Sequence, residues 1–186
     1  MSFQIARRYF TVAEYHRMAE AGIFSEDDRV ELIEGEILKM SPIGSLHASC
    51  VKRLNKLLSS LAGQNAIVSV QDPVQLNDFS EPEPDIALLR PRDDFYAQAH
   101  PTAADVLLVI EIADTSVEYD RNIKLPTYAR SGIPEVLIAN LPADTVEAYA
   151  DPVNGSYQGT RLYKRGESFS PQMLPSIAIK INDILG

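Results

Sequence analysis

The sequence is poor in cysteine and has no long apolar run, and each absence excludes a class of protein. Cys50 is the single cysteine in 186 residues, so the chain cannot form an internal disulfide or supply the thiolates of an iron–sulfur cluster or a cysteine-based zinc site. No apolar segment approaches the roughly 18 to 20 residues that span a bilayer, and the N-terminal residues lack the apolar core of a signal peptide. We therefore expect a cytoplasmic protein without a membrane span, in which Cys50 is a small core residue.

Basic residues are also few, since 17 lysines and arginines stand against 26 acidic residues, for a formal net charge of −9. Such a charge repels nucleic acid on average. Two windows nevertheless contain no acidic residue, one between Glu36 and Asp72 and one between Asp120 and Glu135. Their basic side chains could contact the phosphates of DNA or could simply form solvated helix faces; the candidates are Lys52, Arg53, Lys56 and Arg121.

Several familiar catalytic motifs are missing. The sequence has neither a glycine-rich nucleotide-binding loop nor a Gly-x-Ser-x-Gly nucleophile elbow. Its three histidines, His16, His47 and His100, lack a metal-ligand spacing such as His-x-x-x-His. We therefore do not expect a zinc hydrolase.

The first third of the chain predicts a helix, a hairpin and a second helix. Thr11 and Glu14 have the spacing of a capping box, and Gly22 follows as a stop, which indicates a short helix. Residues 30–39 alternate around Glu34-Gly35, as a β-hairpin does. Apolar residues recur every three or four positions from residue 46 to 61, which predicts the longest helix.

The rest of the chain alternates strands with one more helix. Residues 106–113 and 135–141 are nearly continuous in apolar residues, as strands buried on both faces are. Residues 120–132 have helical spacing, but Pro126 predicts a late start or a kink. Residues 90–104 show no period and should form a surface loop. The order predicts one domain over residues 1–186, a mixed α/β sheet with helices on its faces. The shorter β-like runs are 66–70, 74–76, 85–89, 145–150 and 156–164.

Glu111 is the least ordinary residue, because it interrupts the apolar run "VLLVIEIA". A buried ionised carboxylate needs a cation, a hydrogen-bond network or a raised pKa. Asp85 opens another apolar run, where it could be a turn cap or a second ligand of a hard cation such as Mg²⁺. Lys124 follows in an acid-free segment, and its ammonium could lie beside that cation, although an isolated lysine is more often solvated. Together these groups would suit hydrolysis of a phosphodiester by a metal-activated water.

The order of three motifs resembles that of a known family. Pro84-Asp85, the string "EIA" from Glu111 to Ala113, and the segment from Asp120 to Leu141 look like the large bacterial Uma-two-like family of restriction endonucleases of unknown function. The string "ELIEGEILKMSP" and His47 match the front of that family, so the resemblance covers nearly the whole chain. This family is similar to the PD-(D/E)XK nuclease superfamily. The resemblance implies a restriction-endonuclease-like core, a central mixed β-sheet flanked by helices, preceded by the N-terminal helix and β-hairpin.

The resemblance also implies a Mg²⁺-dependent DNA endonuclease, with Mn²⁺ as a substitute ion. Asp85, Glu111 and the backbone carbonyl of Ile112 would be the metal ligands. The superfamily places a lysine two residues after the glutamate, where this chain has Ala113, and Lys124 is the matching position on the next helix. Lys124 would position or deprotonate the attacking water.

Some candidates and alternatives stay open. Glu36 could add a carboxylate, or could be an exposed hairpin charge, and His47 could contact a phosphate or assist proton transfer. Glu81 and Glu83 are expected to be loop charges without a metal role. The chain could instead be a non-catalytic nucleic-acid-binding or assembly module that retains the nuclease fold, or a hydrolase of small phosphoesters. By analogy, cutting both strands of a duplex would favour a homodimer.

Overall fold

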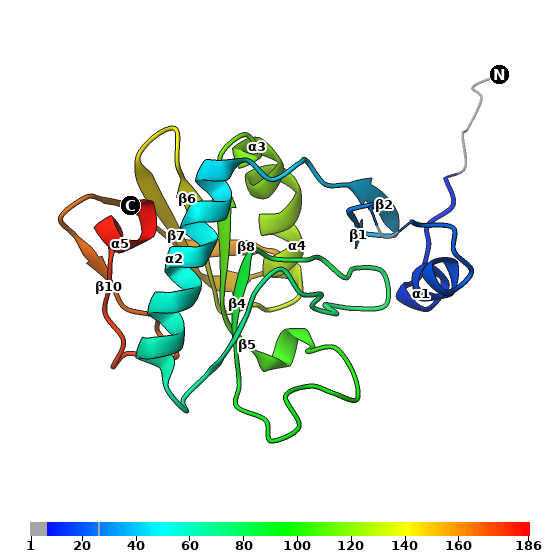
Figure 1. Cartoon of the computed structure of the whole chain (residues 1–186), viewed down its shortest axis with the longest axis horizontal. Coiled ribbons are helices and arrows are strands. Elements are labelled where there is room, and N and C mark those ends of the chain that lie inside the picture. Colours follow the sequence, from blue (N-terminus) through cyan, green and yellow to red (C-terminus); the bar gives the residue numbers. More distant parts are fainter. Residues whose placement is uncertain (1–6, 26) are drawn as a thin grey trace.

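A mixed sheet forms the centre of the computed structural model, which describes residues 7–25 and 27–186 (Figure 1). Strands β5 and β6 are parallel, and every other neighbouring pair in this sheet is antiparallel. The mixed sheet flanked by helices confirms the expected fold class. In spatial order its strands are β3 (Ile67–Ser69), β4 (Ile86–Leu89), β5 (Val106–Ala113), β6 (Glu135–Asn140), β7 (Thr145–Val153) and β8 (Ser156–Lys164).

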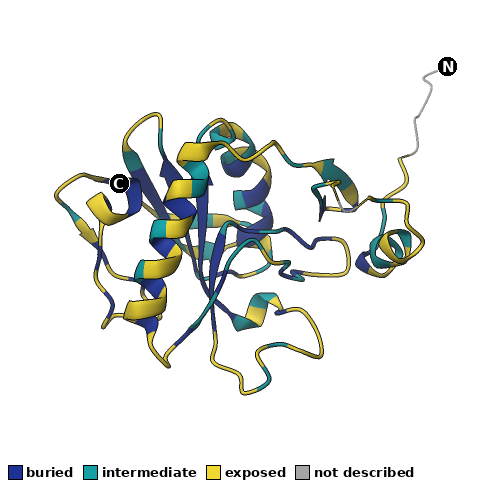
Figure 2. Ribbon diagram, in the orientation of Figure 1, coloured by how far each residue is buried: buried dark blue, intermediate teal, exposed yellow. Residues whose placement is uncertain are grey.

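Helices cover both faces of this sheet, and the alternation of β5 shows which side chains meet each layer. Helix α2 (Ser45–Ala62) packs on one face, where Ile110 and Ile112 join its apolar cluster. Helix α4 (Leu125–Arg130) packs on the other, where Val109 and Ala113 join a second cluster. Side chains alternate along a strand, so Glu111 points to the α4 side. Figure 2 shows that the central strands are buried along their length.

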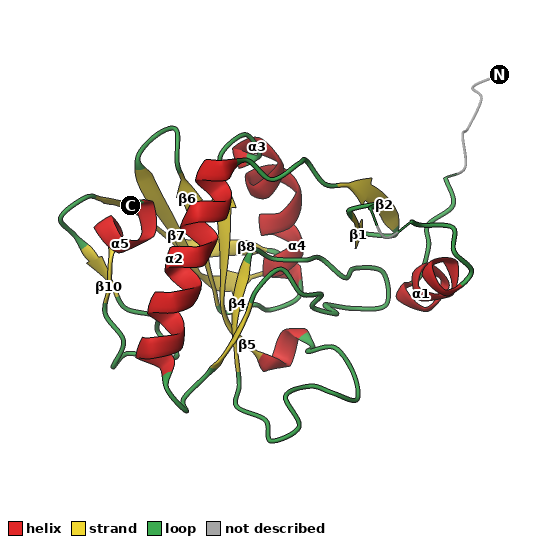
Figure 3. Ribbon diagram, viewed as in Figure 1, coloured by secondary structure: helices red, strands yellow, loops and turns green. Residues whose placement is uncertain are grey.

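The predicted N-terminal elements form beside the sheet (Figure 3). Helix α1 (Val12–Glu20) begins with the complete Thr11–Glu14 capping box. Strands β1 (Val30–Ile33) and β2 (Glu36–Lys39) pair through a turn in which Glu34 and Gly35 both have positive φ, as a two-residue hairpin requires. Gly35 is also needed for space, since a Cβ there would lie 2.5 Å from the Cβ of Tyr9.

The helical segment before β6 neither starts late nor simply kinks at Pro126. It runs through α3 (Val117–Tyr119), a π-helical turn η2 (Asp120–Lys124) and then α4. Pro126 lacks an N–H and leaves a carbonyl of the preceding turn without its α-helical donor. The N–H of Leu125 bonds the carbonyl of Asp120, the five-residue spacing of a π-turn, so the segment widens just before the proline.

The remaining segments largely follow the sequence. Residues 90–102 form turns on the surface, ending at the short helix η1 (Ala103–Asp105). The run 74–76 is not a named strand, because it contributes only an isolated bridge from Gln75 to Thr102. The chain ends with strands β9 (Ser168–Phe169) and β10 (Ile179–Lys180) and helix α5 (Ile181–Leu185).

The single cysteine and the helices can be compared with what the sequence predicts. Cys50 is buried, and its thiol donates to the carbonyl of Ile184 at 2.9 Å, so it is a core residue as expected. Within the described ranges, none of the helices combines the length and apolar character that crossing a membrane demands.

Candidate active site

A cavity of about 390 Å³ lies where the hairpin, the start of α2, the β4–β5 pair and η2 come together. Carboxylates predominate among its charged groups. Arg29, Lys39 and Lys124 are the lysine and arginine side chains among the described residues that line it, beside His47. The acidic residues in its wall are Glu31, Glu83, Asp85, Glu111, Asp114 and Asp120.

Asp85 and Glu111 are cross-strand neighbours. Ile86 pairs with Ile110 in the antiparallel β4–β5 ladder, which places the residue before β4 opposite Glu111. The N–H of Asp85 donates to Oε2 of Glu111 at 3.3 Å, and Oδ2 of Asp85 accepts from the N–H of Ile112 at 2.9 Å. The structure therefore brings together the two carboxylates that the sequence singled out.

His47 and Gln71 hold the other side of the Asp85 carboxylate. Nε2 of His47 lies 2.9 Å from Oδ2, and Nε2 of Gln71 donates to Oδ1 at 3.1 Å. Burial alone would raise the pKa of Asp85, but the hydrogen bond and charge of His47 and the N–H of Ile112 outweigh it and leave this pKa below its usual value. Asp85 is thus an anion at neutral pH.

Glu111 is buried in a very different way. Its side chain is 3% exposed, and Oε1 accepts from the hydroxyl of Tyr128 at 2.6 Å and lies 3.2 Å from Nζ of Lys124. Burial raises the pKa of Glu111 to about 8, even though the charge of Lys124 opposes that rise. The two carboxylates therefore differ in their affinity for a proton.

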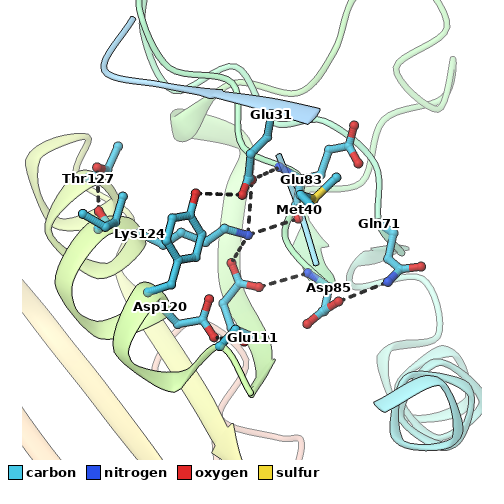
Figure 4. Close-up of polar contacts among 12 residues, drawn as sticks. Glu31, Met40, Gln71, Glu83, Asp85, Glu111, Asp120, Lys124 and Thr127 are labelled. Carbon is cyan, nitrogen blue, oxygen red and sulfur yellow. Dashed lines mark hydrogen bonds and ion pairs between the residues drawn. The ribbon is translucent and has the colours of Figure 1, made fainter. Parts of the chain in front are cut away.

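Lys124 lies between two carboxylates, as Figure 4 shows. Nζ is 3.2 Å from Oε2 of Glu31 and from Oε1 of Glu111, and it donates to the carbonyl of Glu83 at 3.4 Å. Burial disfavours its charge, but the carboxylates of Glu111 and Glu31 outweigh burial and hold the pKa of Lys124 well above its ordinary value. Lys124 is a buried ammonium, and it reaches Glu111, one of the two carboxylates that the sequence singled out.

The cluster has more negative than positive groups. Asp120 is buried as well, bonded to the hydroxyl of Ser116 at 2.7 Å, and burial raises its pKa to about 6. Four carboxylates, those of Glu31, Asp85, Glu111 and Asp120, thus line the same cavity as the buried Lys124. Hard oxygen donors in charge excess are the ligands that Mg²⁺ prefers. The residues present fit a divalent cation.

Glu31 is a residue of this site that the sequence analysis missed. Its side chain is 1% exposed, and Oε1 accepts from the hydroxyl of Tyr119 at 3.0 Å. The signal that selected Glu111, a carboxylate within an apolar strand, also applies to Glu31 in "VELI". Glu36, the hairpin carboxylate that the sequence indicates, has a half-exposed side chain that pairs with Arg7 at 3.0 Å and does not line the cavity. In the hairpin, the buried carboxylate is therefore on β1.

The expected phosphate contacts lie away from the cavity. Lys52 and Lys56 are exposed on α2, and Arg53 donates to the carbonyl of Leu185 at 3.1 Å. Arg121 donates through Nε to Glu147 at 2.9 Å. Among the described residues, none of these four side chains lines the cavity, whereas Arg29 and Lys39 do.

Comparisons with known proteins identify the family and agree with the fold. A sequence model of the family Uma2, described as "Putative restriction endonuclease", matches residues 12–182. A solved structure of "a putative nuclease belonging to DUF820" from Anabaena variabilis ATCC 29413 superposes with a TM-score of 0.75 at 17% sequence identity, covering 95% of this chain and 97% of that one. Comparison with curated proteins gives no match.

Proposed function

This chain belongs to the Uma2 family of restriction-endonuclease-like proteins, and we propose that it is a DNA endonuclease that uses Mg²⁺, or Mn²⁺ in its place, to hydrolyse phosphodiester bonds. One observation carries the proposal. Glu111 contacts the buried ammonium of Lys124, and Asp85 lies opposite Glu111 on the neighbouring strand, in a cavity with excess negative charge.

The carboxylates of Asp85 and Glu111 would hold the cation, with the carbonyl of Ile112 as a third ligand. When bound, the cation would supply a more acidic water and would offset negative charge on the phosphate. Asp85 is already ionised for this task, since its pKa is lowered, and His47 and Gln71 fix its orientation. Glu111 would lose its proton on binding a cation, because metal ligands must be deprotonated.

Lys124 would act as a fixed positive charge. Its raised pKa keeps it protonated, which makes it a poor general base and a suitable partner for charge that develops on a phosphate. Glu31 and the carbonyl of Glu83 hold its ammonium in place. We therefore assign Lys124 to electrostatic stabilisation and positioning, and not to removal of a proton from water.

Arg29 and Lys39 are the candidate contacts to DNA phosphates, because they are the exposed or half-exposed basic side chains in the cavity wall. The net charge of −9 makes such local positive groups necessary for binding a polyanion. This part of the proposal replaces Lys52, Arg53, Lys56 and Arg121 as the first residues to test.

Nicking of supercoiled plasmid tests the proposal. The wild-type chain should relax the plasmid with Mg²⁺ or Mn²⁺ and not in the presence of a chelator. Asp85→Asn and Lys124→Met should each lose at least about 100-fold in rate, the usual scale for losing a major electrostatic group. Lys180→Met, an exposed lysine on β10, is the matched control and should cut normally. Plasmid cutting that persists in both Asp85→Asn and Lys124→Met would refute the assignment of these residues to the active site.

The second candidate is a non-catalytic nucleic-acid-binding or assembly module. It is favoured by the ion pairs of Lys124 with Glu31 and Glu111, which could serve as a structural network alone. Fluorescence anisotropy with labelled duplex separates the two. Binding without cutting, under every divalent cation tested, would favour the module.

A further inference from the structure

Three potential metal ligands meet on the side of the molecule where α1 packs. His16 comes from α1, Glu81 from the extended segment before Asp85, and His100 from the loop before η1. One ligand atom from each lies within 4.8 Å of the other two. Nε2 of His16 is 2.6 Å from Oε1 of Glu81, and the two histidine rings stand edge to face at 6.0 Å.

Glu81 needs a partner that the protein itself does not supply. Its side chain is 2% exposed, so the expectation of a loop charge was wrong. Oε1 contacts His16, but Oε2 is buried and, among the described residues, has no hydrogen-bond partner. A buried carboxylate oxygen without a donor costs free energy, which a bound cation would recover.

The backbone around each of these residues is anchored independently. The N–H of Val12 at the start of α1 donates to the carbonyl of Asp78 at 2.8 Å. The N–H of Glu81 donates to the carbonyl of Leu32 in β1 at 2.7 Å. Pro101, next to His100, accepts from the N–H of Gln75 at 2.9 Å. The side chains are therefore presented together by an ordered framework.

We propose that His16, Glu81 and His100 form a second cation site, for a divalent transition-metal ion of the Zn²⁺ type. Two imidazoles and one carboxylate are ligands that Zn²⁺ accepts, whereas Mg²⁺ prefers oxygen alone. Zinc bonds of about 2.0 to 2.2 Å require ligand atoms roughly 3.3 Å apart. Nε2 of His16 and Oε1 of Glu81, which are 2.6 Å apart, must therefore separate slightly, while His100, whose ligand atom lies within 4.8 Å of the other two, adjusts its position. His100 is exposed and can rotate to do so. Because His16 is only half-buried, water can complete the coordination.

The ion would join three segments that are far apart in the sequence. It would tie α1 and the 90–102 loop to the segment that leads through Glu83 to Asp85. This site shares no ligand with the cavity described above, and it does not depend on the proposed nuclease activity. The role of the ion would be structural, since Glu81 lies in the segment that also pairs with Leu32 of β1.

Zinc titration of the full chain tests the site. The metal-stripped Asp85→Asn protein serves as parent, so that the cavity's own metal ligands are impaired. We expect one Zn²⁺ per chain by calorimetry, and a visible ligand-field spectrum when Co²⁺ is used. His100→Ala and His16→Ala in this parent should weaken Zn²⁺ binding at least about tenfold, the scale of loss for a metal-site residue. His47→Ala, which changes the third histidine, should bind as the parent does.

Thermal unfolding gives a second measurement. A ligand that binds only the folded state raises the melting temperature. Zn²⁺ should therefore raise that of the parent and not that of His100→Ala, while the two proteins melt alike without metal because His100 is exposed. Absence of Zn²⁺ binding in the parent, or binding unchanged by both His100→Ala and His16→Ala, overturns the proposal.

Discussion

Replacing Lys124 by methionine should destabilise the protein strongly, because the change keeps an apolar stem but removes the buried ammonium beside the buried carboxylates of Glu31, Glu111 and Asp120. Removing one partner of a buried ion pair costs about 3–5 kcal/mol, since the other charge stays buried. Glu111, whose pKa is raised to about 8, already holds a proton for most of the time at neutral pH, so the cost should fall near the lower end, about 3 kcal/mol. In a chain of this size that corresponds to a fall in melting temperature of about 6–12 °C.

Urea denaturation at neutral pH, in the presence of a chelator, measures this cost as the change in the free energy of unfolding. Lys180→Met is the matched control, and it should change that free energy by less than about 0.5 kcal/mol. Adding Glu31→Gln to Lys124→Met should recover part of the loss, with a coupling energy of about 0.5–3 kcal/mol. A loss of less than about 1 kcal/mol in Lys124→Met would refute the view that the ammonium neutralises this cluster.

Three further predictions concern protonation and charge. Burial raises the pKa of Glu111 to about 8 from an ordinary 4.5, so the folded state holds a proton that the unfolded state releases. The free energy of unfolding of the metal-free wild type should therefore fall as pH rises from about 5 to 8, by up to about 1.4 kcal/mol per pH unit. That of Glu111→Gln should not fall in this way. Equal shifts of the urea midpoint with pH in the two proteins would contradict this prediction. Burial raises the pKa of Cys50 to about 11, so iodoacetamide should label this thiol only after unfolding. Mass spectrometry detects the label, and rapid labelling of the native chain would contradict the burial of Cys50. Anisotropy titrations at several salt concentrations give the slope of the logarithm of DNA affinity against the logarithm of salt concentration. Replacing Arg29 and Lys39 with alanine in Asp85→Asn should reduce this slope by the equivalent of about two phosphate contacts, whereas an unchanged slope would exclude them as contacts.

Local sequence patterns predicted the elements and part of the site. Glu111 was found because a carboxylate inside an apolar strand contradicts the pattern around it, and Asp85 because it opens the preceding apolar run. Their meeting, however, depends on the register of β4 and β5, which periodicity does not specify. Lys124 was placed by family resemblance, and its contact with Glu31 depends on a hairpin 93 residues earlier in the chain.

The segment "EPEP" shows why other residues were missed. Glu81 and Glu83 resemble the charges of a polar loop, because prolines flank them and no apolar period includes them. In the structure, the N–H of Glu81 bonds β1, and the N–H of Glu83 bonds the side chain of Glu31 at 3.1 Å. Such pairing between distant segments buries Glu81 without leaving a local signal. The proximity of His16 and His100 also leaves no local signal, since the two residues are 84 positions apart in the sequence.

The π-turn η2 controls the rotational phase between two groups of side chains. Tyr119 and Asp120 come before or at its start, whereas Lys124 and Tyr128 come at its end or beyond. In an α-helix each residue advances the rotation by about 100°, and the wider π-turn advances it by less, so η2 holds one residue more than a regular turn. A regular α-helix over the same residues would turn Lys124 and Tyr128 out of phase with Tyr119. The simultaneous contacts of Tyr119 with Glu31 and of Lys124 and Tyr128 with Glu111 therefore depend on this one wide turn.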